Sequence, residues 1–365
     1  MESGLLMKNK ILLISNMYPS EESLLYGIFV KNFENNMNNY GFDLSNKIVM
    51  TKNKNGKLSK IIKYIEFFRS IIKAIKSNEY DVIYVHYITY SLLPFLFVKK
   101  YIKKPLLLNA HGTDVLSNSL IARLIRKLVT PLIESADTII VPSNYFKDIV
   151  SKKFFIDDKR IFISPSGGID ISIFHPFEVG KTDTKFIFGY ISRVDNGKGW
   201  DTLLYAVKKL SEQNILNFEV HIIGGGSEES KMKNAINELN IGNYIKYFGQ
   251  KEHTKLAFYY NQMDVFIFPT KMNESLGLVG LEAMACGTPV IGSNIGGLRE
   301  YIKHDYNGKL FNAGDSDELS TRMKEMINEN DSVMKKYSMN ALSKALEYNA
   351  VDVNKKLKQK IEELV

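Results

Sequence analysis

The sequence is poorest in cysteine: Cys286 is the only one among 365 residues, so the chain cannot form an internal disulfide. Chains without disulfides are typical of reducing compartments. Residues 1–15 also lack the order of charged, apolar and small residues that a signal peptide has. No uninterrupted apolar run reaches the ~18 residues that a membrane-spanning helix needs. These absences predict a cytoplasmic protein without a membrane span.

The sequence contains no nucleic-acid recognition motif and no arginine-rich helix, although its formal net charge is +8. The basic residues are concentrated in the first half. Residues 1–177 carry 24 Lys and Arg against 15 Asp and Glu, whereas the remainder carries 24 against 25. An anionic lipid surface attracts basic segments of this kind. We therefore expect the inner face of the cell membrane, rather than nucleic acid, as an acidic partner.

Two stretches of the basic half mix apolar and basic residues. Residues 92–105 combine aromatic residues with four lysines, and residues 119–133 have the pattern of an amphipathic helix. One face of that helix is expected to carry aliphatic residues beside basic ones, namely Leu120, Ile121, Leu124, Ile125 and Leu128 with Arg123, Arg126 and Lys127. Each stretch is either a core-facing helix with solvated basic residues or a membrane-binding surface. Together with the charge asymmetry, they favour peripheral membrane contact.

Short apolar and β-branched runs alternate with helical patterns along the chain. The expected strands are residues 11–15, 82–86, 105–110, 138–141, 186–191, 218–223, 245–248, 265–268 and 289–292. Most are continuously apolar, as parallel strands buried on both faces are. Strands that alternate with helices predict the α/β class. A segment rich in Pro, Gly and polar residues, 165–185, separates two such series. It predicts two Rossmann-like parallel-sheet domains joined near residue 177, with ligands in the cleft between them.

Two glutamates eight positions apart, Glu274 and Glu282, stand in an otherwise apolar, glycine-dotted run. A carboxylate in such a run is costly to bury unless it is paired or hydrogen-bonded. Gly277 and Gly280, which lie between them, let a ligand approach the backbone closely. The glutamates could cap structural groups, or they could accept hydrogen bonds from the hydroxyls of a sugar.

A helix is expected between these glutamates and the next strand. Gly287 followed by Pro289 is a helix stop. The preceding residues predict a helix over 276–286 with Ser275 as its N-cap, which places Glu282 about two turns inside the helix. The start of a helix offers free N–H groups and a positive dipole end, and therefore binds anions. A ligand with both phosphate and hydroxyl groups would suit this arrangement.

The pattern E-x7-E after an F-x-F-P strand, followed by GLEAMACGTPVI and G-G-x-x-E, resembles the family 4 retaining glycosyltransferases of the GT-B fold. The matching residues are Phe266, Phe268, Pro269, Glu274, Ser275, Gly277, Glu282, Ala283, Gly287, Pro289, Gly296, Gly297 and Glu300. The resemblance implies a basic acceptor-side domain over residues 1–177 and a donor-binding domain over residues 178–345. It also implies a helix over residues 346–365 that crosses back to the first domain.

Several further motifs acquire roles through this resemblance. SRVDNGKG places Arg193 and Lys198 after a strand, where the resemblance assigns them to the donor diphosphate. HGTD places His111 near the anomeric centre of the donor sugar and gives Asp114 a supporting role. Arg193, Lys198 and His111 are therefore expected around the reacting bond together with Glu274.

The remaining donor contacts follow from the same resemblance. Gly27 marks a loop against the donor phosphates and the acceptor, and Gly225 forms a tight turn beside the nucleotide. IIGGGSEE is not a dinucleotide fingerprint, because an acidic residue stands where the third glycine should be. Glu282 is expected to bind the ribose, and Glu274 the hydroxyls of the hexose. The helix start contributes Ser275, Leu276, Gly277 and Leu278, with Glu300 in support.

The implied chemistry needs no metal and no cofactor. Asp315 and Asp317 imitate a D-x-D metal motif, but a polar loop before a helix favours an N-cap there. Arg193, Lys198 and the helix start would stabilise the leaving nucleoside diphosphate instead. The resemblance implies retention, with the acceptor hydroxyl attacking the face that the diphosphate leaves.

The expected activity is transfer of a hexose from a nucleotide diphosphate sugar to a hydroxyl of a lipid-linked or polysaccharide acceptor. A UDP-sugar is the expected donor, and a GDP-mannose-type donor is the alternative. A nucleotide-sugar epimerase would share the fold, but E-x7-E and HGTD argue against it. The third hypothesis is a catalytically silent partner subunit. The presence of all the candidate catalytic residues argues against it. A nicotinamide enzyme is disfavoured because the fingerprint glycines are missing.

Overall fold

The computed structural model of the chain describes residues 8–23, 26–52, 56–180 and 185–365. These residues belong to two compact units. Unit 1 comprises residues 1–167 and 351–365, and unit 2 comprises residues 168–350. Parts of two expected segments, the loop after the first strand and the linker 165–185, fall at residues 24–25 and 181–184 and lie outside the described residues.

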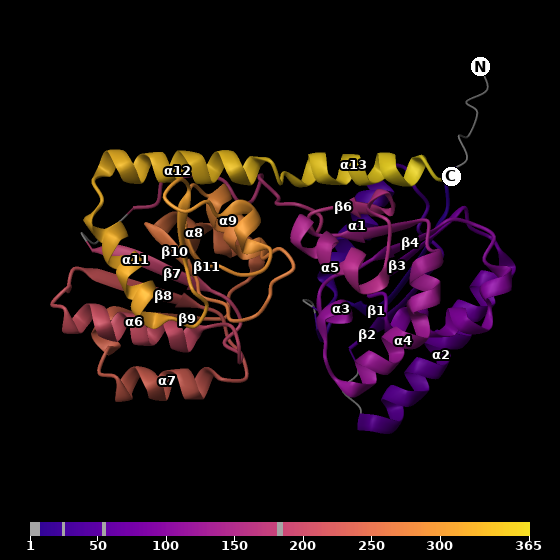
Figure 1. Cartoon of the computed structure of the whole chain (residues 1–365), viewed down its shortest axis with the longest axis horizontal. Coiled ribbons are helices and arrows are strands. Elements are labelled where there is room, and N and C mark those ends of the chain that lie inside the picture. Colours follow the sequence, from indigo (N-terminus) through magenta and orange to yellow (C-terminus); the bar gives the residue numbers. More distant parts are fainter. Residues whose placement is uncertain (1–7, 24–25, 53–55, 181–184) are drawn as a thin grey trace, which may run out of the picture. The chain divides into compact units, whose positions relative to one another are not determined.

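Unit 1 is built on a six-stranded parallel sheet with the order β2-β1-β3-β4-β5-β6. Its strands are β1 (Ile11–Tyr18), β2 (Lys47–Thr51), β3 (Val82–His86), β4 (Leu106–Asn109), β5 (Thr138–Val141) and β6 (Ile161–Ile163). Its helices are α1 (Ile28–Asn39), α2 (Gly56–Ser77), η1 (Tyr90–Phe97), η2 (Lys99–Tyr101), α3 (Thr113–Leu116), α4 (Leu120–Ser135), α5 (Asn144–Phe154), η3 (Asp158–Arg160) and α13 (Ala350–Glu362) (Figure 1).

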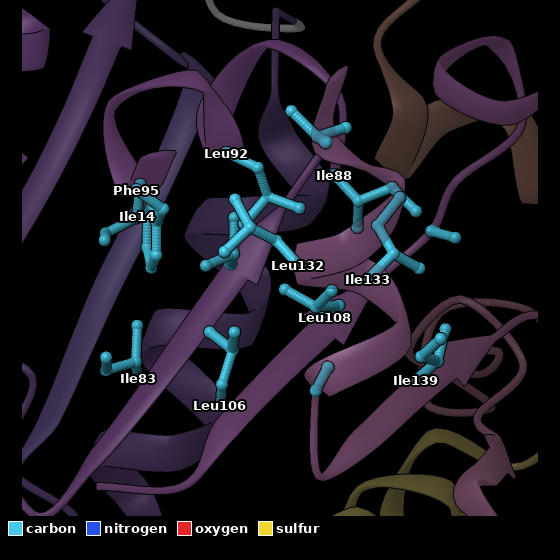
Figure 2. Close-up of a cluster of buried hydrophobic side chains, with 14 of the residues drawn as sticks. Ile14, Ile83, Ile88, Leu92, Phe95, Leu106, Leu108, Leu132, Ile133 and Ile139 are labelled. Atoms are coloured by element: carbon cyan, nitrogen blue, oxygen red, sulfur yellow. The ribbon is translucent and has the colours of Figure 1, made fainter. Parts of the chain in front are cut away.

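Apolar side chains cover both faces of this sheet. Leu12 and Ile14 of β1 belong to one core cluster, whereas Ile11 and Leu13 belong to the cluster on the other face. Figure 2 shows the first cluster, in which side chains of the strands meet those of α4 and η1. Successive residues of a strand point to opposite faces, so burial on both faces requires a continuously apolar strand.

Unit 2 repeats this architecture with the order β12-β11-β10-β7-β8-β9, again all parallel. Its strands are β7 (Phe186–Ile191), β8 (Phe218–Ile223), β9 (Ile245–Gly249), β10 (Val265–Phe268), β11 (Val290–Ser293) and β12 (Gly308–Phe311). Its helices are α6 (Trp200–Glu212), α7 (Glu229–Glu238), η4 (Gly242–Tyr244), η5 (His253–Lys255), α8 (Leu256–Gln262), α9 (Leu278–Ala285), α10 (Leu298–Tyr301), α11 (Ser316–Asn328) and α12 (Asp331–Leu346).

The two parallel sheets confirm the predicted α/β class. All nine expected strands are present, with bounds shifted by a few residues at most. Three strands escaped prediction, namely β2, β6 and β12. They lie at the edges of their sheets, and they are only three to five residues long. Edge strands are less enclosed than central ones, so their sequences need not be continuously apolar.

The last helix, α13, packs on unit 1 although it follows unit 2 in the chain. Leu357 and Ile361 of α13 join the same core cluster as Ile11 and Leu13 of β1. The amide of Asn354 donates to the carbonyl of Gly167 at 3.0 Å. The chain therefore enters and leaves unit 2 at neighbouring positions, where Ile169 and Asn349 form a parallel bridge.

The helix predicted over residues 276–286 is α9, and the structure corrects its start. α9 begins at Leu278, and its N-cap is Gly277 rather than Ser275. Gly277 has a left-handed backbone (φ 88°), which a glycine adopts without strain. Glu282 therefore lies about one turn inside the helix, not two. The predicted stop is confirmed, because Gly287 follows the helix with φ 78°.

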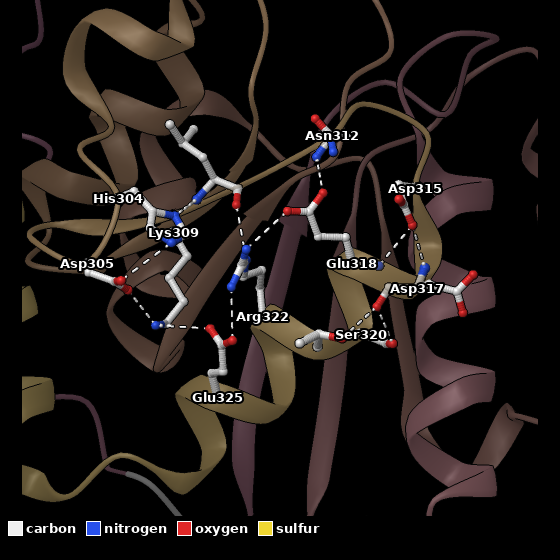
Figure 3. Close-up of polar contacts among 12 residues, drawn as sticks. His304, Asp305, Lys309, Asn312, Asp315, Asp317, Glu318, Ser320, Arg322 and Glu325 are labelled. Atoms are coloured by element: carbon white, nitrogen blue, oxygen red, sulfur yellow. Dashed lines mark hydrogen bonds and ion pairs between the residues drawn. The ribbon is translucent and has the colours of Figure 1, made fainter.

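The D-x-D-like segment caps a helix. The Asp315 carboxylate accepts from the backbone N–H groups of Asp317 and Glu318 and so caps α11 (Figure 3). In the same region, the buried Lys309 ammonium lies between the carboxylates of Asp305 and Glu325, at 2.7 and 3.1 Å. This network holds α11 against β12, which is a structural task.

The amphipathic stretch 119–133 corresponds to α4, and the structure corrects two residues of its expected face, because Arg126 is buried as well as Ile125. Ile125 is buried in the core with Val129, whereas Leu120, Leu124 and their aliphatic neighbours are exposed. Among the described residues, no helix combines the length and the apolar character needed to cross a membrane.

Candidate active site

The strand order places one group of the predicted residues at the carboxyl edge of the unit 2 sheet. β10 and β7 are neighbours, but the chain continues outward from them in opposite directions. Ligands of open α/β sheets bind at such a switch point. Lys198 follows β7 and Glu274 follows β10, so the topology brings these two predicted residues to the same place.

Lys198 and Glu274 form a partly buried ion pair. The Lys198 Nζ lies 2.8 Å from Glu274 Oε1, and the two side chains expose 15% and 20% of their surface. The hydroxyl of Thr270, which is buried after β10, lies 3.2 Å from the same carboxylate oxygen. Such limited exposure weakens solvent screening, so the pair is strongly oriented.

The Glu274 loop is fixed by the glycine pair of the G-G-x-x-E segment. The N–H of Gly297 donates to the Glu274 carbonyl at 2.9 Å. A Cβ on Gly296 would lie 2.6 Å from the same carbonyl oxygen. Glycines are therefore required here because two backbone segments touch, and this contact sets the position of Glu274.

The start of α9 lies directly after this loop. Gly277 is tightly enclosed, because a Cβ there would lie 2.8 Å from the Phe268 ring. Its carbonyl accepts from the Tyr301 hydroxyl at 2.9 Å. Leu276 is buried, whereas Ser275 and Leu278 are half-buried. The first turn of α9 thus follows Glu274 closely in the chain and carries the positive end of the helix dipole.

Arg193 lies in the loop that follows β7, and its role as a clamp stays a prediction. Its guanidinium is 72% exposed and pairs with Asp195 at 2.8 Å. Hydrogen bonds from Ser227 and then the charges of Arg193 and Lys198 lower the pKa of Asp195. Both predicted cations therefore lie within electrostatic range of this carboxylate.

Gly225 belongs to a turn that is tied to the Arg193 loop. The carbonyl of Gly225 accepts from the N–H of Val194 at 3.0 Å, and the N–H of Glu228 donates to the Val194 carbonyl at 2.9 Å. The Ser227 hydroxyl also bonds Asp195. The loops after β7 and β8 thus form one surface at the carboxyl edge of the sheet.

Glu282 is buried on α9, and both of its carboxylate oxygens have partners. His253 Nε2 lies 3.0 Å from Oε1, and the buried Tyr260 hydroxyl donates to Oε2 at 3.1 Å. The hydrogen bond to Glu282 raises the pKa of His253 in spite of partial burial. The apolar run therefore accommodates this carboxylate by pairing it, as its burial requires.

Glu300 lies on the short helix α10 and is half-buried. Burial and then the charge of Glu300 raise the pKa of Tyr348 to about 12. Glu300 therefore acts electrostatically on Tyr348, which follows α12, and its supporting role toward the donor stays a prediction.

Unit 1 carries the other predicted residues, again at a switch point. β1 and β3 are neighbours in the sheet, and the chain continues outward from them in opposite directions. The loop that contains Gly27 follows β1. Gly27 has φ 73° and caps α1. A Cβ at this position would lie 2.6 Å from the backbone of Met17 and Tyr18, so the loop packs too closely for any other residue.

His111 lies in a histidine and aromatic cluster at this edge. Its Nε2 lies 2.8 Å from Nδ1 of His86, the last residue of β3. The rings of Phe29 and Tyr87 are centred 4.3 and 5.3 Å from its ring. Burial lowers the pKa of His111 to about 3. Burial and the neighbouring His111 also lower the pKa of His86, so both imidazoles are neutral at pH 7.

Asp114 shapes the loop that carries His111. Its buried carboxylate accepts from the backbone N–H groups of Gly112 at 2.8 Å, His111 at 3.1 Å, Val115 at 3.1 Å and Ile88 at 3.2 Å. Burial raises the pKa of Asp114 in spite of these hydrogen bonds. The Asp114 side chain therefore fixes the backbone of the HGTD loop through these hydrogen bonds.

The residues that sequence reasoning missed include His86, Thr270 and His253. His86 and Thr270 stand at or just after the carboxyl ends of expected strands, which is a detectable signal. His253 lies in η5, and nothing in its local sequence links it to Glu282. Among the described residues, no three His, Cys, Asp or Glu side chains are grouped as metal ligands. The expected absence of a metal stays a prediction.

Two family profiles match the chain. "Glycosyltransferase Family 4" matches residues 39–172, and "Glycosyl transferases group 1" matches residues 172–344. An uncharacterised glycosyltransferase of Methanocaldococcus jannaschii is 27% identical over 257 residues, which cover 70% of this chain and 67% of the relative.

Two solved structures share the fold. Sucrose-phosphate synthase from Thermosynechococcus elongatus aligns with a TM-score of 0.79 at 19% identity, covering 98% of this chain and 99% of the other. Anabaena Alr3699/HepE, solved in complex with UDP, aligns with a TM-score of 0.76 at 18% identity and covers 97% and 100%.

Proposed function

Because the chain belongs to the family 4 glycosyltransferases of the GT-B fold, we propose that it moves a hexose from a UDP-sugar to an acceptor hydroxyl with retention. The observation that carries this proposal is the Lys198–Glu274 pair at the start of α9. A nucleotide sugar offers both an anion and hydroxyls. Its diphosphate suits the ammonium and the helix start, and its hexose hydroxyls suit the carboxylate.

The leaving group determines what unit 2 must supply. Negative charge grows on the diphosphate as the glycosidic bond breaks, and preorganised cations and N–H groups stabilise that charge. Lys198 and the first turn of α9 are held in place before any ligand arrives. Arg193 is exposed, and it would have to leave Asp195 to join them. Departure of the nucleoside diphosphate would then need no metal.

Glu282 would bind the ribose. His253 and Tyr260 each form a hydrogen bond with one of its carboxylate oxygens. A carboxylate oxygen has two acceptor positions, so each oxygen can still accept a hydrogen bond from a ribose hydroxyl. Because the carboxylate is oriented by these two partners, it would need little reorganisation on binding.

His111 would face the hexose as a neutral hydrogen-bonding group. The proposed transition state resembles an oxocarbenium ion and is positive at the anomeric carbon. An imidazolium beside that carbon would oppose the charge, whereas the lowered pKa of His111 keeps the ring neutral. Glu274 would bind hydroxyls rather than attack, and the departing phosphate would take the acceptor proton.

The choice of uridine follows a structural relative: Anabaena Alr3699/HepE was solved with UDP. A GDP-mannose-type donor is the alternative. The acceptor would be a lipid-linked or polysaccharide hydroxyl, and the excess of Lys and Arg in residues 1–177 supports a lipid-linked acceptor at an anionic membrane. On this proposal the protein works peripherally at the inner face of the cell membrane.

Thermal unfolding in EDTA with UDP, GDP, ADP or dTDP tests the donor assignment. A ligand that binds the native state raises the Tm by mass action. We expect UDP to raise the Tm of the wild type and to raise that of Glu282→Ala much less. Glu282→Gln serves as a second variant, because glutamine has the same size as the glutamate that bonds the Tyr260 hydroxyl. Absence of stabilisation by all four nucleotides at millimolar concentration would favour a silent partner subunit.

A further inference from the structure

The outward sides of α2 and α4 carry apolar side chains where a surface helix normally carries polar ones. On α4 these residues are Leu120, Ile121, Leu124 and Leu128. On α2 they are Leu58, Ile61, Ile62 and Ile65. Each exposes between 45% and 75% of its surface. We call these eight residues the outer apolar face.

The outer apolar face is not needed to hold the helices in the fold. α4 is anchored by its opposite side, where Val129, Leu132 and Ile133 enter the core (Figure 2). α2 is anchored by Phe67 and Ile71 of its later turns. Both helices are therefore apolar on two sides, and the outer side is open to solvent. An exposed apolar surface of this kind marks an interaction site.

The two helices belong to one region of unit 1, because both pack against η1. In the view of Figure 1 they run through the same lower part of the unit. A wholly apolar hollow of about 440 Å³ opens beside α2 and is lined by Lys60, Ile61, Tyr64, Ile65 and Phe68. Its size and apolar lining suit a hydrocarbon chain.

Basic side chains border the outer apolar face on both helices. Arg123 and Lys127 are exposed on α4. On α2 the exposed residues Ile62 and Ile65 lie on the same side of the helix as two exposed basic residues. These are Arg69 and Lys76, which follow Ile65 by about one and three turns. Apolar side chains flanked by cations are typical of helices that lie in a membrane interface. A second copy of the chain would satisfy the apolar residues but bring like charges together.

We propose that the outer apolar face docks unit 1 on an anionic lipid bilayer. Its aliphatic side chains would enter the boundary between headgroups and acyl chains, and the flanking cations would contact lipid phosphates. α4 begins six residues after Asp114, and six residues reach at most about 20 Å. The HGTD loop would thus stand close to the bilayer surface. The delivery of a lipid-linked acceptor rests on the proposed function, whereas binding to lipid does not.

Vesicle co-sedimentation of the full chain tests this surface. Vesicles of phosphatidylcholine with 30% phosphatidylglycerol are compared with pure phosphatidylcholine, using the wild type and L120Q/L124Q. The matched control is Y205Q/L216Q, whose side chains are 54% and 56% exposed in unit 2. R123Q/K127Q isolates the electrostatic part.

We expect the wild type to bind the anionic vesicles and L120Q/L124Q to bind at least about tenfold more weakly. R123Q/K127Q should lose about 30-fold, because each basic residue near an anionic surface contributes about fivefold. Y205Q/L216Q should match the wild type. All four proteins should keep the Tm shift by UDP, so a failure of lipid binding is distinguishable from a failure of the proposed function.

Two results would overturn the proposal. In the first, L120Q/L124Q and the wild type bind anionic vesicles equally well, or neither protein binds them. The other is a dimer in sedimentation equilibrium that L120Q/L124Q abolishes, which would assign the face to a second copy of the chain.

Discussion

The two units use the same sheet architecture and the same edge, yet they present opposite chemistry there. In unit 1 the switch point carries neutral imidazoles and aromatic rings, and Asp114 faces backbone N–H groups. In unit 2 it carries an ion pair, a helix start and a buried glutamate with imidazole and hydroxyl partners. Topology therefore sets where a site forms, and the side chains set what it can bind.

The same comparison explains the placement of charge. Unit 1 contains most of the basic excess, but its candidate site is uncharged apart from Asp114, and cations such as Arg123 and Lys127 lie on outer helices. Unit 2 is nearly balanced overall but concentrates its charges at the sheet edge. Net charge thus reports on the outer surface of unit 1, not on the chemistry of its site.

The largest expected effect comes from Lys198→Met, which removes the cation next to Glu274. Loss of one preorganised group that stabilises a leaving anion costs about 10²- to 10³-fold in turnover. Release of UDP from the UDP-hexose donor measures this loss. Lys271→Met is the matched control, because Lys271 pairs with Asp201 in the same unit. Equal losses in both variants would contradict a specific role for Lys198.

Glu274→Gln separates the hexose from the nucleotide. An amide cannot accept hydroxyl hydrogen bonds as a carboxylate does, and it cannot pair with Lys198 as an ion. We expect turnover to fall by at least about tenfold, because bonds to a charged group contribute about 1.5–3 kcal/mol. The Tm shift by UDP should survive. Unchanged turnover would remove Glu274 from the reaction.

On the unit 1 side, Asp114→Ala should lower the free energy of unfolding by about 3 kcal/mol or more, because buried N–H groups lose their acceptor. Urea unfolding measures this change. Asp137→Ala is the control, since Asp137 is exposed and accepts from the single backbone N–H of Leu106. That variant should lose about 1 kcal/mol. A similar small loss in Asp114→Ala would show that the HGTD loop does not depend on its carboxylate.

The neutral histidines of unit 1 predict a pH dependence of stability. The folded pKa values of His86 and His111 lie below the unfolded value near 6.5. Their contribution is complete above pH 6.5 and is lost as pH falls, because the unfolded chain then binds protons that the folded chain does not. Each should cost about 1.4 kcal/mol between pH 7 and 5.5. His86→Gln should remove one such contribution, and an unaltered slope in that variant would refute it.

The smallest effect concerns His253 of unit 2, where the sign is reversed. Its pKa is raised by Glu282, so the stabilisation is present below the unfolded value and disappears as pH rises through the folded one. An NMR titration of the imidazole should give a pKa above 6.5 in the wild type and a lower one in Glu282→Gln. The same value in both proteins would break the contrast with unit 1.

Much of this comparison could be predicted from the sequence. Continuous apolar runs revealed the buried strands, and the resemblance led to Glu274, Lys198 and His111. Local patterns could not show that β3 lies beside β4, which brings His86 against His111. Nor could they show that Gly277, not Ser275, caps α9, because that choice depends on the packing of Phe268 and Tyr301.

Unit 2 is proposed to bind the donor diphosphate through Lys198 at the switch point. Calorimetric titration in EDTA of UDP and of uridine into the wild type and Lys198→Met tests it most directly. We expect the variant to bind UDP at least about tenfold more weakly, since hydrogen bonds to a charged group contribute about 1.5–3 kcal/mol. Uridine should bind both proteins alike. Equal UDP affinity in the two proteins would contradict it.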